Sequence, residues 1–544
     1  MLSRFIIIFT LILPLSILAE ENINTVSNPT FAELISGLTT KKFEEKDRLI
    51  QLIGLSQHDR SLVILKTLLE GKLYYKKDDK TIVITEKSGK EAHITSALDD
   101  TDLGTVSKRK IKKIGINNKL RRSLNIQIAQ LSLADKDPAI RKSAVEKMFN
   151  KIDEQALLLI EKRLSIEKND DVIETLKTAI FLENLHSSDN EVKLEAISAL
   201  SSSLYPEVRA SLNKLKDSFE NKNLSNDDGL LLQAIDKSLT KIESKVGIYK
   251  QVENIFFGIS LGSVLLLIAV GLAITFGVMG VINMAHGEML MLGAYTTYII
   301  QQILPNHIEY SILISIPTAF VFTALVGIGI ERGVIRFLYG RPLETLLATF
   351  GISLILQQAV RTLISPQNRA VSTPDWMSGS LEINPALSLT FNRLYIIIFA
   401  MLVLIGLMLL LNKSKFGLQV RAVTQNRSMA KAMGIRTDLI DAFTFGLGSG
   451  IAGIAGVALS QLTNVGPNLG QAYIIDSFMV VVFGGVGNLW GTLFGAMSLG
   501  IANKYLEPVT GAVLAKIVVL IFIILFIQKR PRGMFALKGR SVEN

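Results

Sequence analysis

The chain has 544 residues, of which 49% are hydrophobic and only 19% are charged, and its formal net charge is +10. Soluble globular domains carry about 25% charged residues, so the composition excludes an ordinary soluble enzyme, a disordered chain and a collagen-like fibre as descriptions of the whole. Cysteine is absent, which excludes disulfides, thiolate metal sites and cysteine nucleophiles.

The first 19 residues have the pattern of a secretory signal peptide. Arg4 precedes an apolar stretch, Phe5–Leu15, and polar residues begin at Glu20, directly after Ala19. The stretch is shorter than the roughly 20 residues that a spanning helix needs. We therefore predict a signal peptide over residues 1–19, with an uncleaved anchor as the alternative. A signal peptide would place the following domain outside the cytoplasm.

Residues 20–250 are polar, and we expect them to form a mainly helical periplasmic domain. Tyr74–Thr85 predicts two short strands around a Lys-Asp-Asp-Lys turn. Helix starts further along place Ile140, Val172 and Val208 at intervals of 32 and 36 residues. This spacing resembles HEAT-type helix pairs, and an ordinary helical bundle is the alternative.

Two features of this half invite functions that we do not predict. The basic segment 108–122 lacks interleaved aromatic residues, so we expect a solvated face or contact with anionic membrane lipid, and no nucleic acid. His58, His93 and His186 have no partners at ligand spacing, so no metal site is expected.

From residue 255 onward the composition changes to that of a membrane protein. Residues 255–544 hold only 19 basic and 11 acidic side chains. We predict an all-α polytopic membrane domain over 251–530, with eight or nine transmembrane segments, and a cytoplasmic tail over 531–544. Short segments around Asn283–Glu288 and Gly484–Asn488 suggest broken or re-entrant elements.

Lysines and arginines in short loops predict the orientation of the membrane domain. Three basic regions are expected to face the cytoplasm: 332–341, 413–436 and the carboxyl-terminal residues from Lys529. The carboxyl terminus is then cytoplasmic. With a periplasmic amino-terminal domain the number of crossings must be odd, so nine fits, whereas eight requires a cytoplasmic amino-terminal part.

Polar residues within apolar segments are the candidates for a substrate pathway, because polar groups at membrane depth are costly. Lys516 in the last segment is expected to pair with Asp476 or to extend toward the interface. Interhelical hydrogen bonding, a helix end or an external turn are the alternatives to a pathway role. The candidates are Asn283, His286, Glu288, Gln357, Gln358, Asn464 and Asp476.

One cytoplasmic loop differs from the others. Arg421–Gly434 has a basic, amphipathic helix pattern that ends in glycine. Such a helix lies on lipid or docks into a partner as a coupling element. The candidate coupling residues are Arg421, Asn426, Arg427, Ala430 and Gly434.

Three stretches in chain order resemble permeases of the branched-chain amino-acid type of ATP-binding-cassette (ABC) transporter. Gly280–Tyr295 resembles the hallmark stretch of that family, Arg421–Thr437 its coupling region and Phe483–Ala496 its glycine-rich late helix. The older signature of such permeases is Glu-Ala-Ala, three residues and Gly. Ala430 and Gly434 keep this spacing, whereas serine and methionine replace the first two positions.

Within that family, the urea transporter permeases are the most similar. The resemblance lies in an exported amino-terminal extension of about this size, in Leu346–Arg361 and in Asn464–Gly485. It implies urea as the substrate, with a branched-chain or other amino acid as the alternative. It also implies import through the bacterial inner membrane by alternating access.

The resemblance implies several partners. These are a second, related permease subunit, two cytoplasmic ATPase subunits and a periplasmic substrate-binding protein. The chain has no Gly-x-x-x-x-Gly-Lys-Ser/Thr motif, so it is expected to bind no cofactor and to be no enzyme, with ATP used by its partners. A passive urea or amide channel and a membrane-anchored sensor or scaffold are the alternatives of other classes.

Overall fold

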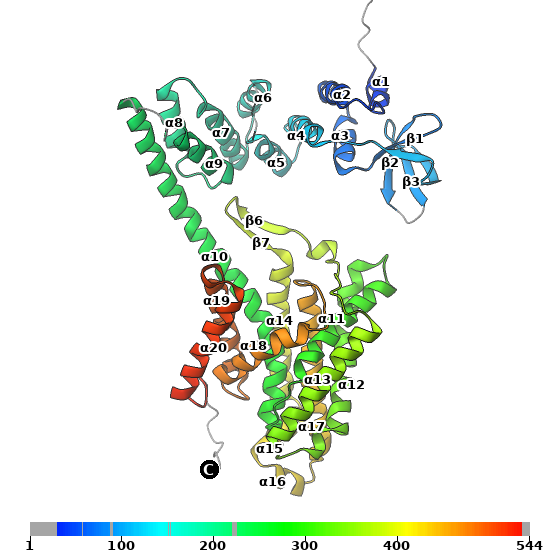
Figure 1. Ribbon diagram of the computed structural model, residues 1–544, viewed down its shortest axis with the longest axis vertical. Helices are drawn as coiled ribbons and strands as arrows, with labels where there is room; N and C mark the ends of the chain where they lie inside the picture. Colours follow the sequence, from blue (N-terminus) through cyan, green and yellow to red (C-terminus); the bar gives the residue numbers. More distant parts are fainter. Residues whose placement is uncertain are drawn as a thin grey trace, which may run out of the picture. The chain divides into compact units, whose positions relative to one another are not determined.

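A computed structural model describes residues 30–56, 58–87, 91–150, 152, 154–219 and 226–535. The predicted signal peptide, 1–19, lies outside the described residues, as do residues 536–544 of the predicted tail. The chain divides into two compact units (Figure 1). The amino-terminal unit comprises Met1–Ser203 and Ala210–Ser238, and the carboxyl-terminal unit comprises Leu204–Arg209 and Leu239–Asn544.

The amino-terminal unit begins with three helices and a small antiparallel sheet in the order β4-β3-β2-β1-β5. The predicted hairpin is confirmed, because β1 pairs with β2 across a turn in which Lys80 has a positive φ of 58°. The three further strands were not predicted. The elements are α1 (Phe31–Gly37), α2 (Phe43–Leu55), α3 (Ser61–Glu70), β1 (Leu73–Lys76), β2 (Ile82–Lys87), β3 (Glu91–Ser96), β4 (Asp102–Ser107) and β5 (Ile111–Lys113).

Helices follow the sheet, and acidic or amide side chains start several of them. Asp137, Asn169 and Asp189 accept hydrogen bonds from the first turns of α5, α7 and α8, as capping residues do. α5 packs against α4 and α7, and α7 packs against α6 and α8. The HEAT-like description stays a prediction. The helices are α4 (Asn118–Ser132), α5 (Pro138–Met148), α6 (Glu154–Leu164), α7 (Asp170–Asn184), α8 (Asn190–Leu200) and α9 (Pro206–Asp217).

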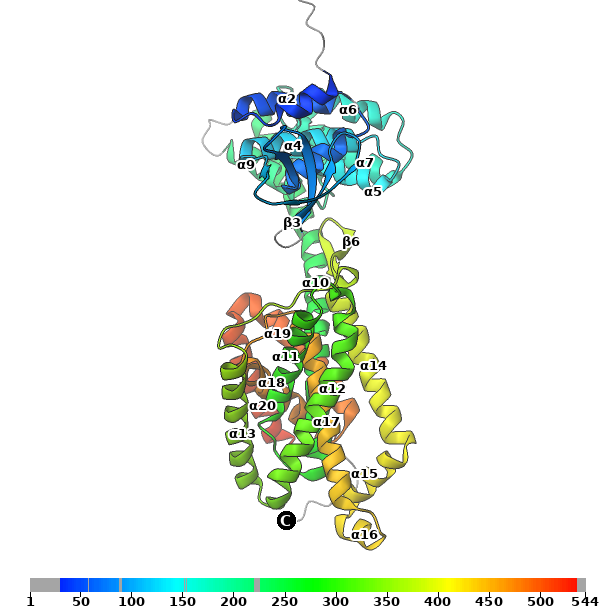
Figure 2. The same ribbon diagram turned by 90° about the vertical axis from the view of Figure 1, so that its right-hand side faces the viewer.

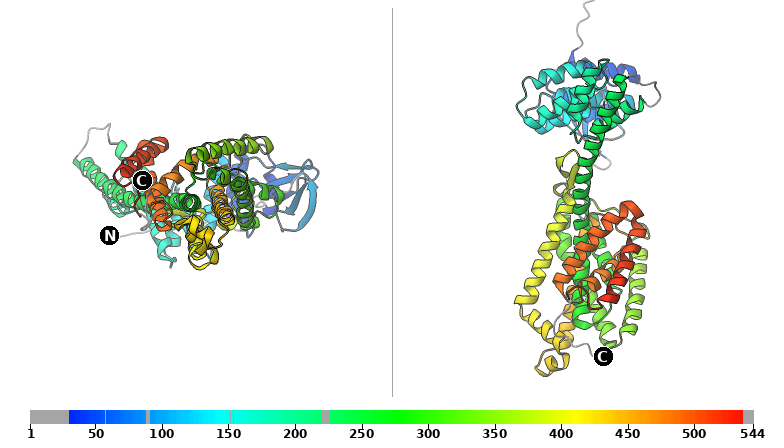
Figure 3. Two further views of the ribbon diagram at one scale, coloured as in Figure 1. Left: turned by 90° about the horizontal axis from the view of Figure 1, so that it is seen from below. Right: turned by 90° about the vertical axis from the view of Figure 1, so that its left-hand side faces the viewer.

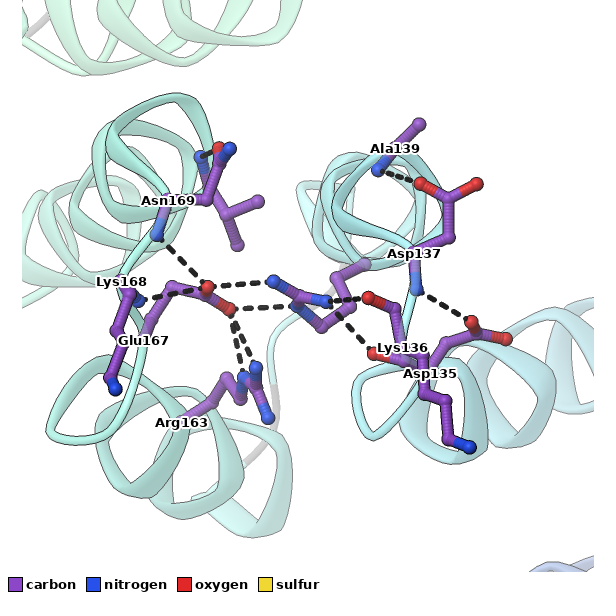
Figure 4. A network of polar contacts seen from close by, with 10 residues as sticks. Asp135, Lys136, Asp137, Ala139, Arg163, Glu167, Lys168 and Asn169 are labelled. Atoms are coloured by element: carbon purple, nitrogen blue, oxygen red, sulfur yellow. Dashed lines mark hydrogen bonds and ion pairs between the residues drawn. The ribbon is translucent and has the colours of Figure 1, made fainter.

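A buried ion pair fastens α5 to the connection between α6 and α7 (Figure 4). Arg141 donates to both carboxylate oxygens of Glu167, at 2.7 and 2.8 Å, and to the carbonyls of Asp135 and the residue after it. Glu167 also accepts from Arg163 and from the backbone N–H of Asn169. The hydrogen bond from Arg141 holds the pKa of Glu167 well below its usual range.

The carboxyl-terminal unit is built of helices, with one short hairpin. Figure 2 shows most of them running along one direction. Helix α10 (Asn226–Met279) begins in the amino-terminal unit and continues into the carboxyl-terminal unit. The other elements are α11 (His286–Ile303), α12 (Ile308–Gly333), η1 (Ile335–Phe337), α13 (Pro342–Leu363), η2 (Asp375–Met377), β6 (Ser380–Asn384), β7 (Leu387–Thr390), α14 (Phe391–Lys413), α15 (Lys415–Gln425), α16 (Arg427–Ala432), α17 (Thr437–Ser460), α18 (Leu469–Gly484), α19 (Leu489–Thr510) and α20 (Ala512–Lys529).

Six helices of the described residues are long and apolar enough to cross a membrane: α10, α12, α13, α14, α17 and α20. α18 is apolar but shorter, and α11 and α19 are not among the six. The unit is thus a polytopic membrane domain, while the finer count of eight or nine crossings stays a prediction. The chain leaves helical geometry before α11 and again between α18 and α19, where the sequence predicts broken elements.

α17 is the most deeply buried of the six, because 89% of its 18-residue apolar stretch is buried inside the protein. It packs against α11 and α12 (Figure 2). Gly448 of α17 meets Gly271 of α10 so closely that a Cβ on Gly448 would lie 2.7 Å from the Gly271 carbonyl oxygen. Small residues therefore allow these backbones to touch, as the glycine pattern of membrane helices predicts. On the other side of α10, α18, α19 and α20 pack together (Figure 3).

Candidate functional site: a buried carboxylate and a coupling region

A buried carboxylate lies where α11, α13 and α18 meet. Glu288, in the first turn of α11, is 1% exposed. Its Oε1 accepts hydrogen bonds from Ser353 Oγ at 2.8 Å and from Gln357 Nε2 at 2.7 Å, both on α13. Its Oε2 is buried and has no partner among the described residues. A Cβ on Gly470 of α18 would lie 2.9 Å from this oxygen, so the glycine leaves room for it.

The polar side chains next to Glu288 take part in the start of α11, and their role in a pathway stays a prediction. Asn283 Oδ1 accepts from the N–H of Ala285, which closes the turn before α11. His286 is completely buried, and its Nε2 lies 3.0 Å from the Ile268 carbonyl of α10. Because a carbonyl only accepts, Nε2 donates here. These contacts hold the first turn of α11 against α10 and present Glu288 to α13.

The structure separates the remaining pathway candidates. Gln357 faces Glu288, whereas Gln358 is exposed and donates a hydrogen bond to Thr362, at 3.4 Å. Asn464 is exposed in the loop before α18. Asp476 lies elsewhere on α18 and forms an ion pair with Lys516 at 2.8 Å, so the pairing predicted from the sequence is confirmed.

Sequence reasoning missed a polar stripe that continues from the carboxylate. Ser353, Gln357 and Arg361 follow one another at intervals of four on α13, which places them on one face of the helix. Arg361 Nη2 donates to Asn468 Oδ1 of the loop before α18, at 2.7 Å. This spacing was visible in the sequence. The three elements α11, α13 and α18 thus share hydrogen-bonding groups over two helical turns.

The coupling region is two helices, not the single helix that the sequence predicts. Asn426 has extended backbone angles and ends α15, and its Oδ1 accepts from the N–H of Met429, which starts α16. An asparagine side chain competes for backbone hydrogen bonds in this way, which explains the break. Gly434, with φ of 86°, ends α16, as its place after the amphipathic pattern predicts.

Arginines fasten both coupling helices to the membrane helices. Arg421 of α15 donates to the Leu411 carbonyl of α14. Arg427 of α16 forms a two-pronged ion pair with Asp441 of α17, and its guanidinium lies 4.5 Å from the ring centre of Tyr339. Although burial disfavours its charge, the hydrogen bonds to Asp441 raise the pKa of Arg427.

The same region packs through an apolar contact and leaves an exposed face. Ala430 is buried with Val423 of α15 and Ile440 of α17. Met429 and Met433 are exposed on α16. The interior contacts make α15, α16 and the start of α17 one packed body. Among the described residues, no three histidine, aspartate or glutamate side chains gather as metal ligands would.

Residues 254–527, half of the chain, match the family described as "Branched-chain amino acid transport system / permease component". The high-affinity branched-chain amino acid permease protein BraD of Pseudomonas aeruginosa is 29% identical over 296 residues, which cover 53% of this chain and 96% of BraD. LivH of Escherichia coli K12, a permease protein of the same kind, is 31% identical over 293 residues, covering 52% and 94%.

A third match, the ribose import permease protein RbsC of Bacillus subtilis, is 31% identical over 108 residues, covering 19% of this chain and 34% of RbsC. No solved structure matches the chain. The apolar helices define a multi-pass membrane protein. The chain belongs to the family of permease components of ABC-type branched-chain amino acid transport systems.

Proposed function

We propose that this chain is the membrane-spanning subunit of an ABC importer that moves urea into the cell through the inner membrane. The observation that carries the proposal is the buried Glu288, whose Oε1 accepts hydrogen bonds from Ser353 and Gln357 and whose Oε2 is buried without a partner among the described residues. An intramembrane ionisable residue is costly and is usually tied to a transported substrate or ion.

Urea suits such a site because it is small, neutral and rich in N–H donors. The Oε2 of Glu288, which has no partner among the described residues, is an acceptor for one or two of them, and Gly470 packs closely beside it without a side chain. A neutral solute requires no second charge. The stretches Leu346–Arg361 and Asn464–Gly485, which resemble urea permeases, contain Gln357 and Gly470, two of the residues around this oxygen.

A branched-chain amino acid is the second candidate, and two observations favour it. The relatives BraD and LivH are named as permeases for such amino acids. Arg361 lies one turn beyond Gln357, so a zwitterion has a carboxylate for its ammonium group and a guanidinium for its carboxylate. The names of relatives do not agree on one substrate, because RbsC, which matches over a shorter stretch, is named for ribose.

The proposed cycle is alternating access. A periplasmic binding protein delivers the solute, two ATPase subunits close on ATP, and α15 and α16 pass their movement to α14 and α17 through Arg421 and Arg427. A second, related permease subunit completes the pathway. In this proposal nine segments cross the membrane, the HEAT-like amino-terminal domain is periplasmic after signal-peptide removal, and the carboxyl terminus is cytoplasmic.

Uptake in cells tests the proposal. A deletion strain without urease activity is complemented with the wild-type chain or with Glu288→Gln, which keeps the size and removes the charge. Entry of labelled urea and labelled leucine at low concentration is followed with and without ATP depletion. Glu344→Gln is the matched control, because Glu344 is exposed and pairs only with Arg341 on the surface.

We expect ATP-dependent urea uptake to fall at least about tenfold in Glu288→Gln and to stay normal in Glu344→Gln. Leucine uptake that depends on the chain would assign the same site to amino acids. Urea entry that is unaffected by ATP depletion would show that the chain acts as a passive channel and not as part of an importer. Normal uptake by Glu288→Gln would remove Glu288 from the pathway.

A further inference from the structure

A polar cavity lies away from Glu288, near the ends of several membrane helices. It has a volume of about 310 Å³ and is lined by α10, α14, α18, α19 and α20 and by the end of α17. Arg393 is the third residue of α14, Lys516 the fifth of α20, and Lys504 lies six residues before the end of α19. The cavity therefore lies within about two helical turns of the helix ends.

Most of the charges in this cavity neutralise each other. Asp476 pairs with Lys516 at 2.8 Å, and Glu507 pairs with Lys504 at 2.7 Å. The fifth charged side chain is Arg393. Its guanidinium lies 4.7 Å from the ring centre of Phe257, and no hydrogen bond or ion pair reaches it from the described residues. The lining thus has one positive charge in excess.

A second group in the cavity also lacks a partner. Asn503 of α19 is only 8% exposed, and its Oδ1 is buried without a hydrogen-bond donor among the described residues. A buried polar atom of this kind is destabilising unless a ligand or water satisfies it. The cavity therefore offers an anion site at Arg393 and an acceptor at Asn503.

The surroundings indicate that the ligand has an apolar body. Phe257 and Leu261 of α10 and Leu459 and Leu462 at the end of α17 form the apolar wall. Only 17% of the 18-residue apolar stretch of α20 is buried inside the protein. Val513, which follows the lining residue Ala512, is exposed. A ligand at this depth meets hydrocarbon on one side and charge on the other.

We propose that this cavity binds the head group of a membrane phospholipid. The phosphate diester would accept hydrogen bonds from the Arg393 guanidinium, and an amine or hydroxyl of the head group would donate to Asn503 Oδ1. The acyl chains would lie along α10 and α20. Basic pockets between membrane helices near the interface bind lipid head groups for the same reasons. This site is independent of the identity of the transported solute.

Lipid retention tests the site. The full chain is purified in a mild detergent, and phospholipid that stays bound is measured by mass spectrometry for wild type, Arg393→Gln and Arg393→Lys. The control is Arg336→Gln, because Arg336 also lies 4.7 Å from a phenylalanine ring, that of Phe337, but outside the cavity. Delipidated protein is then heated with phosphatidylethanolamine, phosphatidylglycerol, inorganic phosphate, leucine or urea.

We expect Arg393→Gln to retain at least about tenfold less phospholipid than wild type, and Arg393→Lys and Arg336→Gln to retain most of it. A phospholipid should raise the melting temperature of wild type but not of Arg393→Gln. Equal retention by wild type and Arg393→Gln would overturn the proposal. So would Arg393-dependent protection by inorganic phosphate, leucine or urea alone, since the cavity would then bind a solute.

Discussion

The ion pair between Arg427 and Asp441 gives the sharpest test of the coupling region, since it joins α16 to α17. The perturbations are Arg427→Gln, Asp441→Asn and the two together. Arg427→Gln leaves a buried carboxylate without its cation. Asp441→Asn leaves a cation that reaches water more easily. The double variant removes both charges and leaves two amide side chains of similar size.

The expected magnitude follows from how deeply the two partners lie. The side chain of Asp441 is 0% exposed, whereas that of Arg427 is 39% exposed. Breaking a fully buried pair costs about 3–5 kcal/mol, and exposed pairs contribute about 0–1 kcal/mol. A pair with one buried and one half-buried partner should lie between these limits, at about 2 kcal/mol, which corresponds to about a 30-fold change in an equilibrium.

The assay is a double-mutant cycle on the initial rate of ATP-dependent solute uptake, normalised to the amount of chain in the membrane. We expect Arg427→Gln to lose most of the uptake, Asp441→Asn to lose less, and the double variant to recover part of the loss in Arg427→Gln. Membrane insertion should be unchanged. Additive losses, or wild-type uptake by Arg427→Gln, would refute the view that this pair transmits movement.

Three further predictions concern backbone conformation, helix packing and a buried ion pair. Gly434→Val should abolish solute uptake without preventing membrane insertion, because the φ of 86° at Gly434 is strained for a branched side chain. The control is Gly329→Val, which should leave uptake normal because a Cβ at Gly329 has no neighbour within 4 Å. Gly448→Val should lower the melting temperature of the purified chain, because the new side chain would separate α17 from α10. Gly329→Val is again the control and should leave the melting temperature unchanged. Arg141→Ala should destabilise the amino-terminal unit by about 3–5 kcal/mol in a denaturant titration, unless Glu167→Gln accompanies it.

The last pair also predicts a pH dependence. Because the pKa of Glu167 is lower in the folded than in the unfolded chain, its stabilising contribution is present above the unfolded pKa, near 4.5. It is lost as the pH falls through the folded pKa. The melting temperatures of the wild type and of Glu167→Gln, plotted against pH, should therefore converge as the pH falls below 4.5. Parallel curves over this range would contradict the assignment.

The sequence predicted local features better than contacts between distant elements. The hairpin around Tyr74–Thr85 and the helix starts before Ile140, Val172 and Val208 depend on neighbouring residues, so patterns along the chain identify them. Strands β3–β5 were missed because they are short and mostly polar, although β3 alternates buried with more exposed residues. Asn426 was placed inside one helix because amphipathicity was read without its capping tendency.

In the candidate site, too, local patterns were easier to predict from the sequence than contacts between distant elements. Gln357 and Gln358 are chemically equal, and only the helical phase with Ser353 separates the inward from the exposed side chain. Tyr339 and Asp441 were not predicted as partners of Arg427, because the tertiary fold brings them together across separate elements. Their own sequence surroundings contain nothing that marks such a contact.

The burial of α17 has a mechanical consequence. Where Gly448 meets Gly271, and where Gly453 and Gly456 of α17 meet α11, backbone lies on backbone. Interlocked side chains resist axial movement, whereas two smooth backbone surfaces allow a helix to shift or turn with small loss of contact. Pushed at Asp441, this 24-residue helix would carry a displacement as a stiff rod over about 36 Å. Glycines that look like simple packing residues would then set how easily the transporter changes state.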